Sequence, residues 1–166
     1  MKQVSGKPQS PAVQGQCLCG AVRLELGVPA RWAWHDHSPA TRQAHGAAYA
    51  TYVGSYRSRF RITAGGEHVA RFHHEATATT RNFCAICGTP IFYERGHSPQ
   101  MVNVPRALLS GRSGREPRYH IARQDSPDWA YAGEALVPLK GFPGVLWAPP
   151  RKRKRVAAEP WSEPSG

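Results

Sequence analysis

The sequence predicts a mainly β protein with one core, on three observations. The chain has 166 residues, of which 40% are hydrophobic, enough to bury one core but not two large ones. Its 16 glycines and 15 prolines argue against a helical bundle and for short strands joined by turns. Four cysteines form two tight pairs, Cys17 with Cys19 and Cys84 with Cys87. We therefore expect small antiparallel sheets pinned at the cysteines, with minor helices.

Composition divides the chain into three parts. Residues 1–14 are rich in Gln, Ser, Pro and Lys, and we expect a flexible N-terminal segment there. Residues 15–148 carry the strand patterns and form the expected domain. Residues 149–166 contain the uninterrupted basic run Arg151–Arg155 and little that can be buried, so we expect a basic, disordered C-terminal tail.

Strands are expected in order along the domain. The first covers residues 21–26, where Val22, Leu24 and Leu26 alternate with polar residues. Further segments rich in β-branched and aromatic residues are bounded by turn residues, and these are 47–53, 59–63, 68–72, 89–94 and 101–104. After a loop-like stretch, residues 119–121 resume an ordered segment.

Helix signals are sparse. A Ser-Pro start predicts one helix over residues 38–44, and a second Ser-Pro predicts a short turn at residues 126–130. Helices are therefore expected to be accessories to the sheets.

Charge and hydropathy limit the function classes. No segment approaches the roughly 18 consecutive apolar residues of a membrane span, and no signal-peptide pattern is present, so we expect a cytoplasmic protein without a membrane partner. Lys and Arg number 22 against 11 Asp and Glu, giving a formal net charge of +11. Such a basic protein attracts anions, either nucleic acid or a small anionic substrate. No phosphate-binding glycine loop or Ser/His/Asp set is evident.

The cysteine pairs favour a metal site. Cytosolic thiols stay reduced, so four cysteines there act more often as metal ligands than as disulfides. Two short pairs brought together would supply the four thiolates of a tetrahedral Zn²⁺ site, with Cys17, Cys19, Cys84 and Cys87 as ligands. Metal-free buried thiols, long-range disulfides and a redox dithiol at Cys84–Cys87 are the alternatives.

Three motifs carry a family resemblance. They are Gly15-Gln16-Cys17-Leu18-Cys19-Gly20-Ala21-Val22, Arg81-Asn82-Phe83-Cys84-Ala85-Ile86-Cys87-Gly88-Thr89-Pro90-Ile91-Phe92-Tyr93, and Pro117-Arg118-Tyr119-His120-Ile121 followed by Trp129. In this order they resemble the glutathione-dependent formaldehyde-activating enzyme (GFA) family, also called centromere-protein-V-like. The resemblance covers roughly residues 15–143.

The resemblance implies a fold and an activity. The fold is a mainly β arrangement of the β-tent (Mss4-like) type, with a structural zinc on the four cysteines. The activity is that of carbon–sulfur lyases, in which a second zinc handles the thiol of glutathione or its adduct with an aldehyde. A small anionic thiol, or a thiol–aldehyde adduct, would then be the ligand. Separately from the resemblance, an open sheet edge makes a homodimer a further expectation.

The chain departs from the family at this second zinc. The family carries a Cys-x-Cys-x-x-Cys motif between the two cysteine signatures, and the matching positions here are His35, His37 and Ala40. Histidines two apart on an extended segment point to one side, so His35 and His37 could share a metal while Asp36 points away. Two ligands are too few for tight zinc binding. The third would come from the substrate thiolate or from a nearby residue: Asp36, His45, His97 or His120.

Two readings of function follow. In the catalytic one, His35 and His37 hold the second metal, Asp36 or His45 acts as base, and Arg42 or Arg57 holds substrate carboxylates. In the other, the His35–His37 segment is an ordinary surface loop, and the protein is a non-catalytic zinc-stabilised module that contacts nucleic acid or acidic partners through its basic surface and tail. The alternation of Arg57, Arg59 and Arg61 would suit an anion-binding stripe or a solvated strand face.

Overall fold

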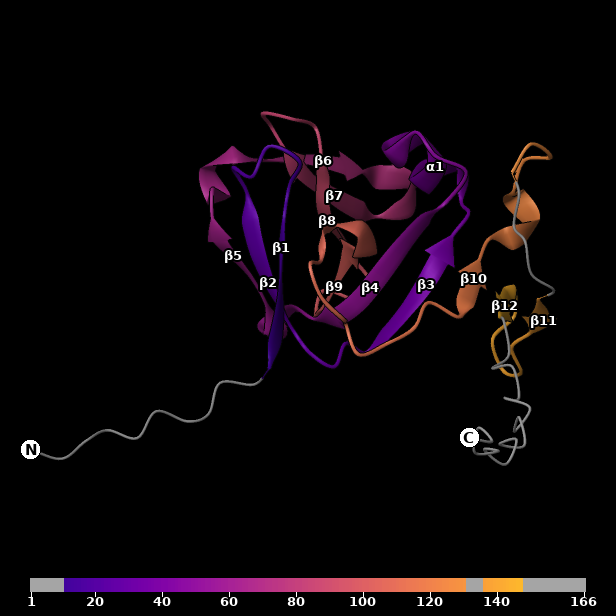
Figure 1. Ribbon diagram of the computed structural model, residues 1–166. Helices are drawn as coiled ribbons and strands as arrows, with labels where there is room; N and C mark the ends of the chain where they lie inside the picture. Colours follow the sequence, from indigo (N-terminus) through magenta and orange to yellow (C-terminus); the bar gives the residue numbers. More distant parts are fainter. Residues whose placement is uncertain (1–10, 131–135, 148–166) are drawn as a thin grey trace, which may run out of the picture.

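Two β-sheets make up most of the protein in the computed structural model, which describes residues 11–130 and 136–147 (Figure 1). The smaller sheet has the strand order β1-β2-β5 and is antiparallel, and its strands are β1 (Ala12–Gln16), β2 (Arg23–Gly27) and β5 (Phe60–Ala64). Its N-terminal strand lies directly beside β2, so the first cysteine pair sits in the tight connection between them.

The larger sheet has nine strands in the order β11-β12-β10-β3-β4-β9-β8-β7-β6. The strands are β11 (Val137–Pro138), β12 (Val145–Trp147), β10 (Tyr119–Ile121), β3 (Trp32–Asp36), β4 (Ala50–Tyr56), β9 (Met101–Pro105), β8 (Pro90–Arg95), β7 (Thr79–Cys84) and β6 (Val69–His74). All neighbouring strands pair antiparallel except β10 and β3, which run parallel.

Within residues 11–130 and 136–147, helical structure is limited to short elements. The α-helix α1 (Pro39–His45) begins behind Ser38, whose hydroxyl accepts a hydrogen bond from the Thr41 amide, and ends at Gly46. Five 3₁₀ turns join strands, and they are η1 (Arg57–Arg59), η2 (Gly66–His68), η3 (Glu75–Thr77), η4 (Arg106–Leu108) and η5 (Arg123–Asp125). No helix among the described residues is long and apolar enough to cross a membrane.

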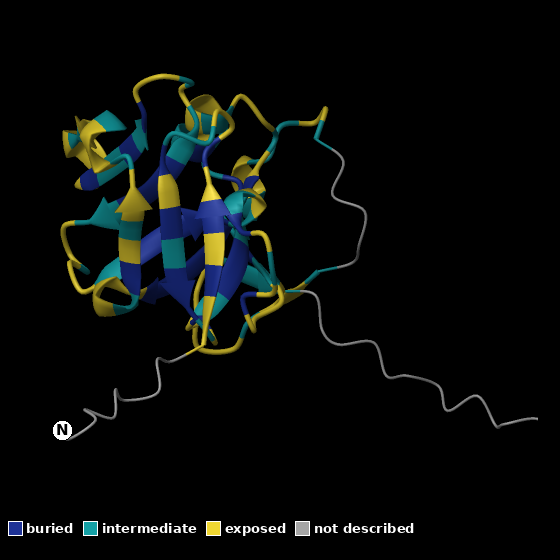
Figure 2. Ribbon diagram, turned by 60° about the vertical axis from the view of Figure 1, so that its left-hand side comes forward, coloured by how far each residue is buried: buried dark blue, intermediate teal, exposed yellow. Residues whose placement is uncertain are grey.

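The main core lies between the two sheets. Val22, Leu24 and Leu26 are almost fully buried, and they pack in one cluster with Val53 and Val104 of the larger sheet. Figure 2 shows the result as alternating buried and exposed bands along the strands. The alternation of hydrophobic and polar residues that predicted the strand at residues 21–26 therefore corresponds to a strand with one buried and one more exposed face.

A second, aromatic cluster occupies the other face of the larger sheet. Trp34, Ala50, Tyr52 and Tyr93 are buried there. The Trp34 and Tyr52 rings lie 5.8 Å apart, and the Tyr52 and Tyr93 rings pack edge to face at 4.9 Å. Because side chains alternate along a strand, β3 gives Ala33 to the main core and Trp34 to this second face.

The expected elements are largely present. The mainly β fold class, the helix at residues 38–44 and the strands at 21–26, 59–63, 68–72, 89–94 and 101–104 are confirmed within a few residues. The strand expected over 47–53 begins only at Ala50, because the chain turns after α1. Strands β1, β3, β7, β11 and β12 were missed.

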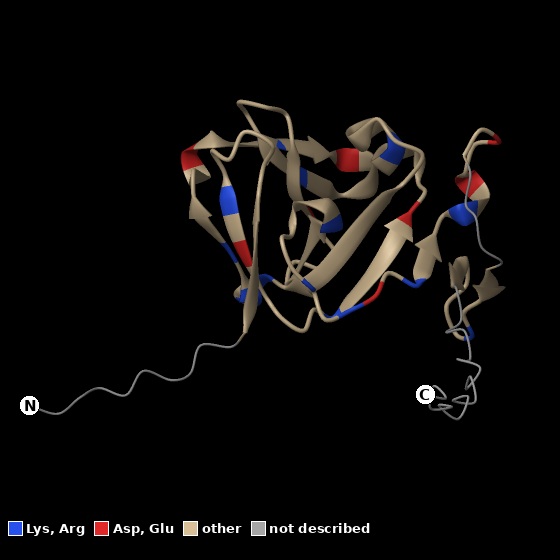
Figure 3. Cartoon of the chain, in the orientation of Figure 1, with Lys and Arg blue, Asp and Glu red and all other residues tan. Residues whose placement is uncertain are grey.

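The expected domain boundary needs correction. Residues 1–14 were expected to lie outside the domain, but β1 begins at Ala12 and pairs with β2, with Val13 buried in the core. Of the polar residues in that segment, Gln14 is a solvent-facing residue of this edge strand, and residues 1–10 lie outside the described residues. The basic run Arg151–Arg155 and the expected tail lie outside the described residues. In the described part, Figure 3 shows charged residues of both signs spread over the ribbon.

We predict that Gly65 is required for the sheet connection that holds the first cysteine turn. Gly65 has a φ of +69°, and an added Cβ would overlap the Ala21 carbonyl oxygen. Gly65→Ala should lower the free energy of unfolding by about 2 kcal/mol or more, measured by urea denaturation. Gly66→Ala is the matched control, since its nearest neighbour is 3.9 Å away. Equal effects of the two substitutions would contradict this role.

Candidate functional site

The four cysteines converge at one point between the two sheets. Cys17 and Cys19 lie in the turn between β1 and β2, Cys84 ends β7, and Cys87 lies in the turn before β8. Their Sγ atoms all lie within 4.8 Å of one another, with 3.5 Å between Cys17 and Cys19 and 3.9 Å between Cys19 and Cys84. Tetrahedral Zn–S bonds of about 2.3 Å place sulfurs about 3.8 Å apart. The cluster can therefore hold a metal ion.

Polar contacts favour thiolates at Cys17 and Cys87. At Cys19 the Ala21 amide lowers the pKa, but hydrogen bonds with the neighbouring cysteines outweigh it and raise the pKa of Cys19 to about 12. The Val22 amide donates to Cys17 Sγ at 3.3 Å. The Thr89 hydroxyl lies 3.1 Å from Cys87 Sγ, and hydrogen bonding by Thr89 lowers the pKa of Cys87 to about 5. All four cysteines are free of disulfides, so the alternative of long-range disulfides is not realised here. Deprotonated sulfur is the form that binds metals.

His35 and His37, which stand where the family has its second zinc motif, lie in and directly after the end of β3. As their spacing predicts, His35 and His37 lie on one side of the strand, where both rings contact Tyr49 and His120. Parallel pairing of β10 with β3 places His120 beside His35. His37 Nε2 lies 2.9 Å from His120 Nδ1, and His37 Nδ1 lies 2.9 Å from the Ser126 hydroxyl. His37 and His120 thus form a buried, hydrogen-bonded pair.

Both members of this pair are neutral at physiological pH. Burial lowers the pKa of His37 to about 4, with Arg123 and His35 adding to the effect. Burial likewise lowers the pKa of His120 to about 4, assisted by its two histidine neighbours. His35 has its own partner, because its Nδ1 lies 2.9 Å from the Thr51 hydroxyl.

This donor set does not complete a second family-type metal site. Among the described residues, only the four cysteines bring three or more ligand atoms together. Asp36 faces the other side of β3, and His45 bonds to the Tyr52 hydroxyl at 2.6 Å. Two ring nitrogens converge, those of His37 and His120. A catalytic zinc site usually has three protein ligands. The structure therefore supports no step through a second metal.

A polar hollow of about 290 Å³ opens on the other side of the same turn. We call it the polar hollow, and it is lined by Asp36, Ser38, Ala40, Thr41, Thr77, Thr79, Arg81, Tyr93, Arg95 and His97. It includes Ala40, the position that carries the third family cysteine. Asp36 is buried, and its Oδ1 accepts a hydrogen bond from the Ser38 amide at 2.9 Å.

Two guanidinium groups face this hollow. Strand pairing puts Thr79 opposite Arg95 and Arg81 opposite Tyr93, so these side chains share one face of the sheet. The two arginines lie over the Tyr93 ring, with distances of 5.6 and 5.5 Å from ring centre to guanidinium carbon. Neither forms an ion pair with a carboxylate among the described residues. The hollow can therefore take an anion.

The arginines that the sequence suggested as anion ligands have other partners. Arg42 donates to the backbone carbonyls of His37 and Asp125, and so ties α1 to the β10 region. Arg57 pairs with Glu94 at 3.1 Å. These two side chains stabilise the fold rather than line the hollow.

The expected arginine stripe is absent from β5. Arg57 and Arg59 belong to the turn η1, where Arg59 donates to the carbonyls of Val28 and Pro29. Arg61 pairs with Glu25 at 2.6 Å. The alternation that suggested a stripe is real only from Phe60 onward, because the strand starts there.

The residues that sequence reasoning missed are Arg81, Arg95 and Thr79. Arg81 was noticed only as part of the second cysteine motif, and Arg95 follows an expected strand without a local signal. These residues share a hollow with Asp36 because of the strand order β3-β4-β9-β8-β7 in the larger sheet. Strand order cannot be deduced from any local sequence pattern.

Comparison with known proteins gives a family and a likeness to solved structures. The sequence model of the family described as glutathione-dependent formaldehyde-activating enzyme matches residues 12–125. A crystal structure of a Rhodobacter sphaeroides protein is similar, with a TM-score of 0.50 and 23% sequence identity, over 60% of this chain and 89% of that one. At this identity the likeness shows the fold alone. The search among curated proteins found no match.

We predict one bound metal per chain, held by the cysteines. Native mass spectrometry should find one metal ion in the wild type, none in Cys84→Ser, and one in the His35→Ala, His37→Ala double variant. Cys84→Ser should also lower the Tm by roughly 10 °C or more, because metal binding contributes folding free energy. Two metals in the wild type, falling to one in the histidine variant, would contradict this count.

We also predict an acid-sensitive stability that originates in the histidine pair. The pKa values of His37 and His120 are lowered from 6.5 to about 4, so between these values the unfolded chain binds more protons than the folded one. Stability should therefore fall as the pH drops from 6.5 towards 4. Urea denaturation at pH 7 and pH 5 should show a smaller loss in the His37→Gln, His120→Gln double variant. An identical loss in both proteins would show that other groups are responsible.

Proposed function

We propose, from the premise that the chain belongs to the glutathione-dependent formaldehyde-activating enzyme family, that it is a carbon–sulfur lyase acting on adducts of an anionic thiol with an aldehyde. The family model spans most of the described residues. The observation that carries the proposal is the polar hollow, where the buried Asp36 carboxylate shares one small space with the guanidinium groups of Arg81 and Arg95.

The four-cysteine cluster has a structural part in this proposal. Four thiolates in tetrahedral arrangement are a typical donor set for Zn²⁺, so zinc is the metal we propose there. When bound, the ion would fix the two cysteine turns to each other. The reacting groups belong to the polar hollow.

The hollow can hold a substrate such as a glutathione adduct by its charges. Glutathione carries two carboxylates, and arginine pairs with carboxylate through two parallel hydrogen bonds. Arg95 and Arg81 are half-buried and form no ion pair with a carboxylate among the described residues, so their guanidinium groups can pair with a substrate carboxylate. Hydroxyls of Thr41 and Thr79 add neutral hydrogen-bonding groups to the same walls.

Asp36 is the proposed base. In the cleavage direction it accepts the proton of the adduct's carbinol hydroxyl, the C=O bond forms, and the C–S electron pair leaves on sulfur. The sulfur then takes the proton back from Asp36, giving thiol and aldehyde. The Ser38 amide holds the carboxylate in place through Oδ1. The reverse sequence joins thiol and aldehyde.

The histidines act behind this turn rather than in it. His37 and His120 hold each other, and Arg42 binds the His37 carbonyl, so the turn carrying Asp36 is fixed from its far side. In this proposal His35 and His37 are positioning residues, which differs from the metal-ligand role expected from the sequence.

We predict that Asp36→Asn lowers turnover by about 10²-fold or more, because the amide keeps the hydrogen bond from Ser38 but cannot take the proton. The measurement is NMR magnetisation exchange between glutathione plus an aldehyde and their adduct, above the uncatalysed rate, made with formaldehyde and with benzaldehyde. Asp128→Asn, at an exposed acid, is the matched control and should match the wild type. A wild type no faster than buffer would refute the proposed function, and an active Asp36→Asn would refute the role of Asp36.

A further inference from the structure

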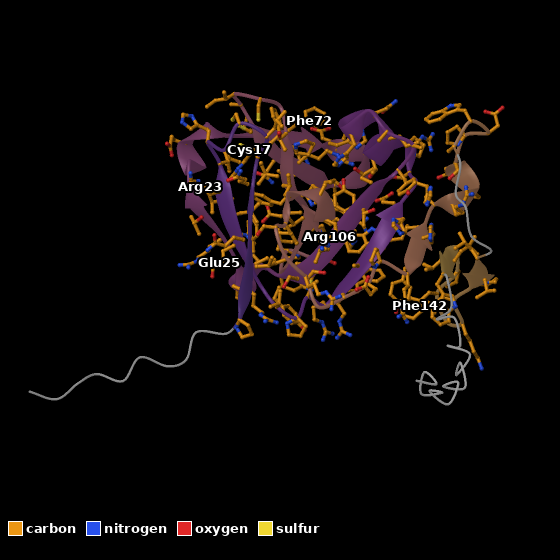
Figure 4. All side chains as sticks on the ribbon, viewed as in Figure 1. Cys17, Arg23, Glu25, Phe72, Arg106 and Phe142 are labelled. Atoms are coloured by element: carbon orange, nitrogen blue, oxygen red, sulfur yellow. The ribbon has the colours of Figure 1, made fainter. Side chains whose placement is uncertain are left out.

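A second cavity adjoins the polar hollow on the same face of the larger sheet. It has a volume of about 430 Å³, and we call it the apolar chamber. Its walls are mainly apolar, with Ala44, Phe72, Phe83, Pro90, Tyr93 and Pro105 among them. Phe72 is 54% exposed at the rim, and Figure 4 labels it on the same upper edge of the molecule as Cys17.

The chamber and the hollow meet at two shared side chains. Arg81 and Tyr93 line both cavities. Strand pairing explains this, because Phe72 lies opposite Arg81 and Arg81 opposite Tyr93, so one row of side chains crosses the sheet face. Above that row, α1 gives Thr41 to the hollow and Ala44 to the chamber. A single ligand lying along α1 would therefore contact both cavities.

The two cavities differ in chemistry. Arg81 is the one charged residue lining the chamber, since burial lowers the pKa of His45 and keeps its ring neutral. Tyr52 bonds His45 at 2.6 Å and accepts from Arg81 at 3.3 Å, so these polar groups largely satisfy one another. Apart from Asn82, the remaining wall offers apolar contact. The hollow suits an anionic group and the chamber an uncharged, apolar one.

The chamber is also far larger than a one-carbon aldehyde requires. Formaldehyde has two heavy atoms and would fill roughly the space of two waters, about 60 Å³. Leaving a chamber of about 430 Å³ beside it would forfeit most of the available apolar contact. A group the size of an aromatic ring or a longer alkyl chain uses this space.

We infer that the aldehyde-derived half of the substrate is a bulky apolar group that occupies the apolar chamber, while the anionic thiol half lies in the polar hollow. This inference rests on the proposed function. It narrows the substrate class to thiol adducts of aryl or long-chain alkyl aldehydes.

Stable thioethers test the inference without catalysis. S-methylglutathione and S-benzylglutathione share the anionic half and differ in the group that would enter the chamber. Calorimetric titration of the full chain should show S-benzylglutathione binding at least about 10-fold more tightly, from burial of the ring. Ala44→Phe, which narrows the chamber, should remove that preference and leave S-methylglutathione binding unchanged.

Two further variants complete the design. Gln43→Phe adds the same ring at the neighbouring exposed helix position, which lines neither cavity, and should keep the wild-type preference. Phe72→Ala removes an exposed wall residue without disturbing the core, and should reduce the preference severalfold.

The outcomes separate the two proposals. Equal affinity for both thioethers in the wild type would overturn this inference and leave the proposed function standing. No binding of either would overturn the proposed function, and the inference with it. A benzyl preference that survives both Ala44→Phe and Phe72→Ala would place the ring elsewhere and also overturn the inference.

Discussion

The meeting of two cysteine turns from different sheets is the constraint on which this structure depends. Cys17 and Cys19 belong to the small sheet, Cys84 and Cys87 to the large one, and Cys19 and Cys84 are 65 residues apart in sequence. Bringing their sulfurs within bonding range of one ion fixes where the sheets face each other. The apolar residues between the sheets then form a single core. The cluster thereby also orients β7 and β8, the strands that carry Arg81 and Arg95.

The site uses the face of the large sheet that the core leaves free. Alternation along β3 sends Ala33 to the core and Trp34 and Asp36 to the second face. The same alternation on β7 and β8 sends Arg81 and Tyr93 to that face. A buried carboxylate can thus approach two guanidinium groups without breaking the core, and the short helix α1 closes the space above them.

The sequence predicts the fold and the cysteine cluster well, for physical reasons. In a strand with one buried face, hydrophobic residues recur at every second position. In a protein whose thiols stay reduced, clustered cysteines have few roles other than metal binding. It predicts poorly where both faces of a strand are buried, as in β3, or where an edge strand is polar, as in β1. His120 was one of several candidates beside the histidine motif, and only the parallel pairing of β10 with β3 selects it. Arg81 and Arg95 line one hollow with Asp36 only because of strand order, so no local pattern could have found them.

The central claim is that the anionic thiol half of the substrate binds in the polar hollow, and mapping a bound thioether of glutathione tests it most directly. S-methylglutathione titrated into the ¹⁵N-labelled chain should shift backbone amide signals around Asp36, Thr79 and Arg95. Signals of the small sheet and of the first cysteine turn should stay in place, since none of their residues lines the hollow. Shifts confined to β10 and the histidine pair, or no shifts at all, would contradict the account.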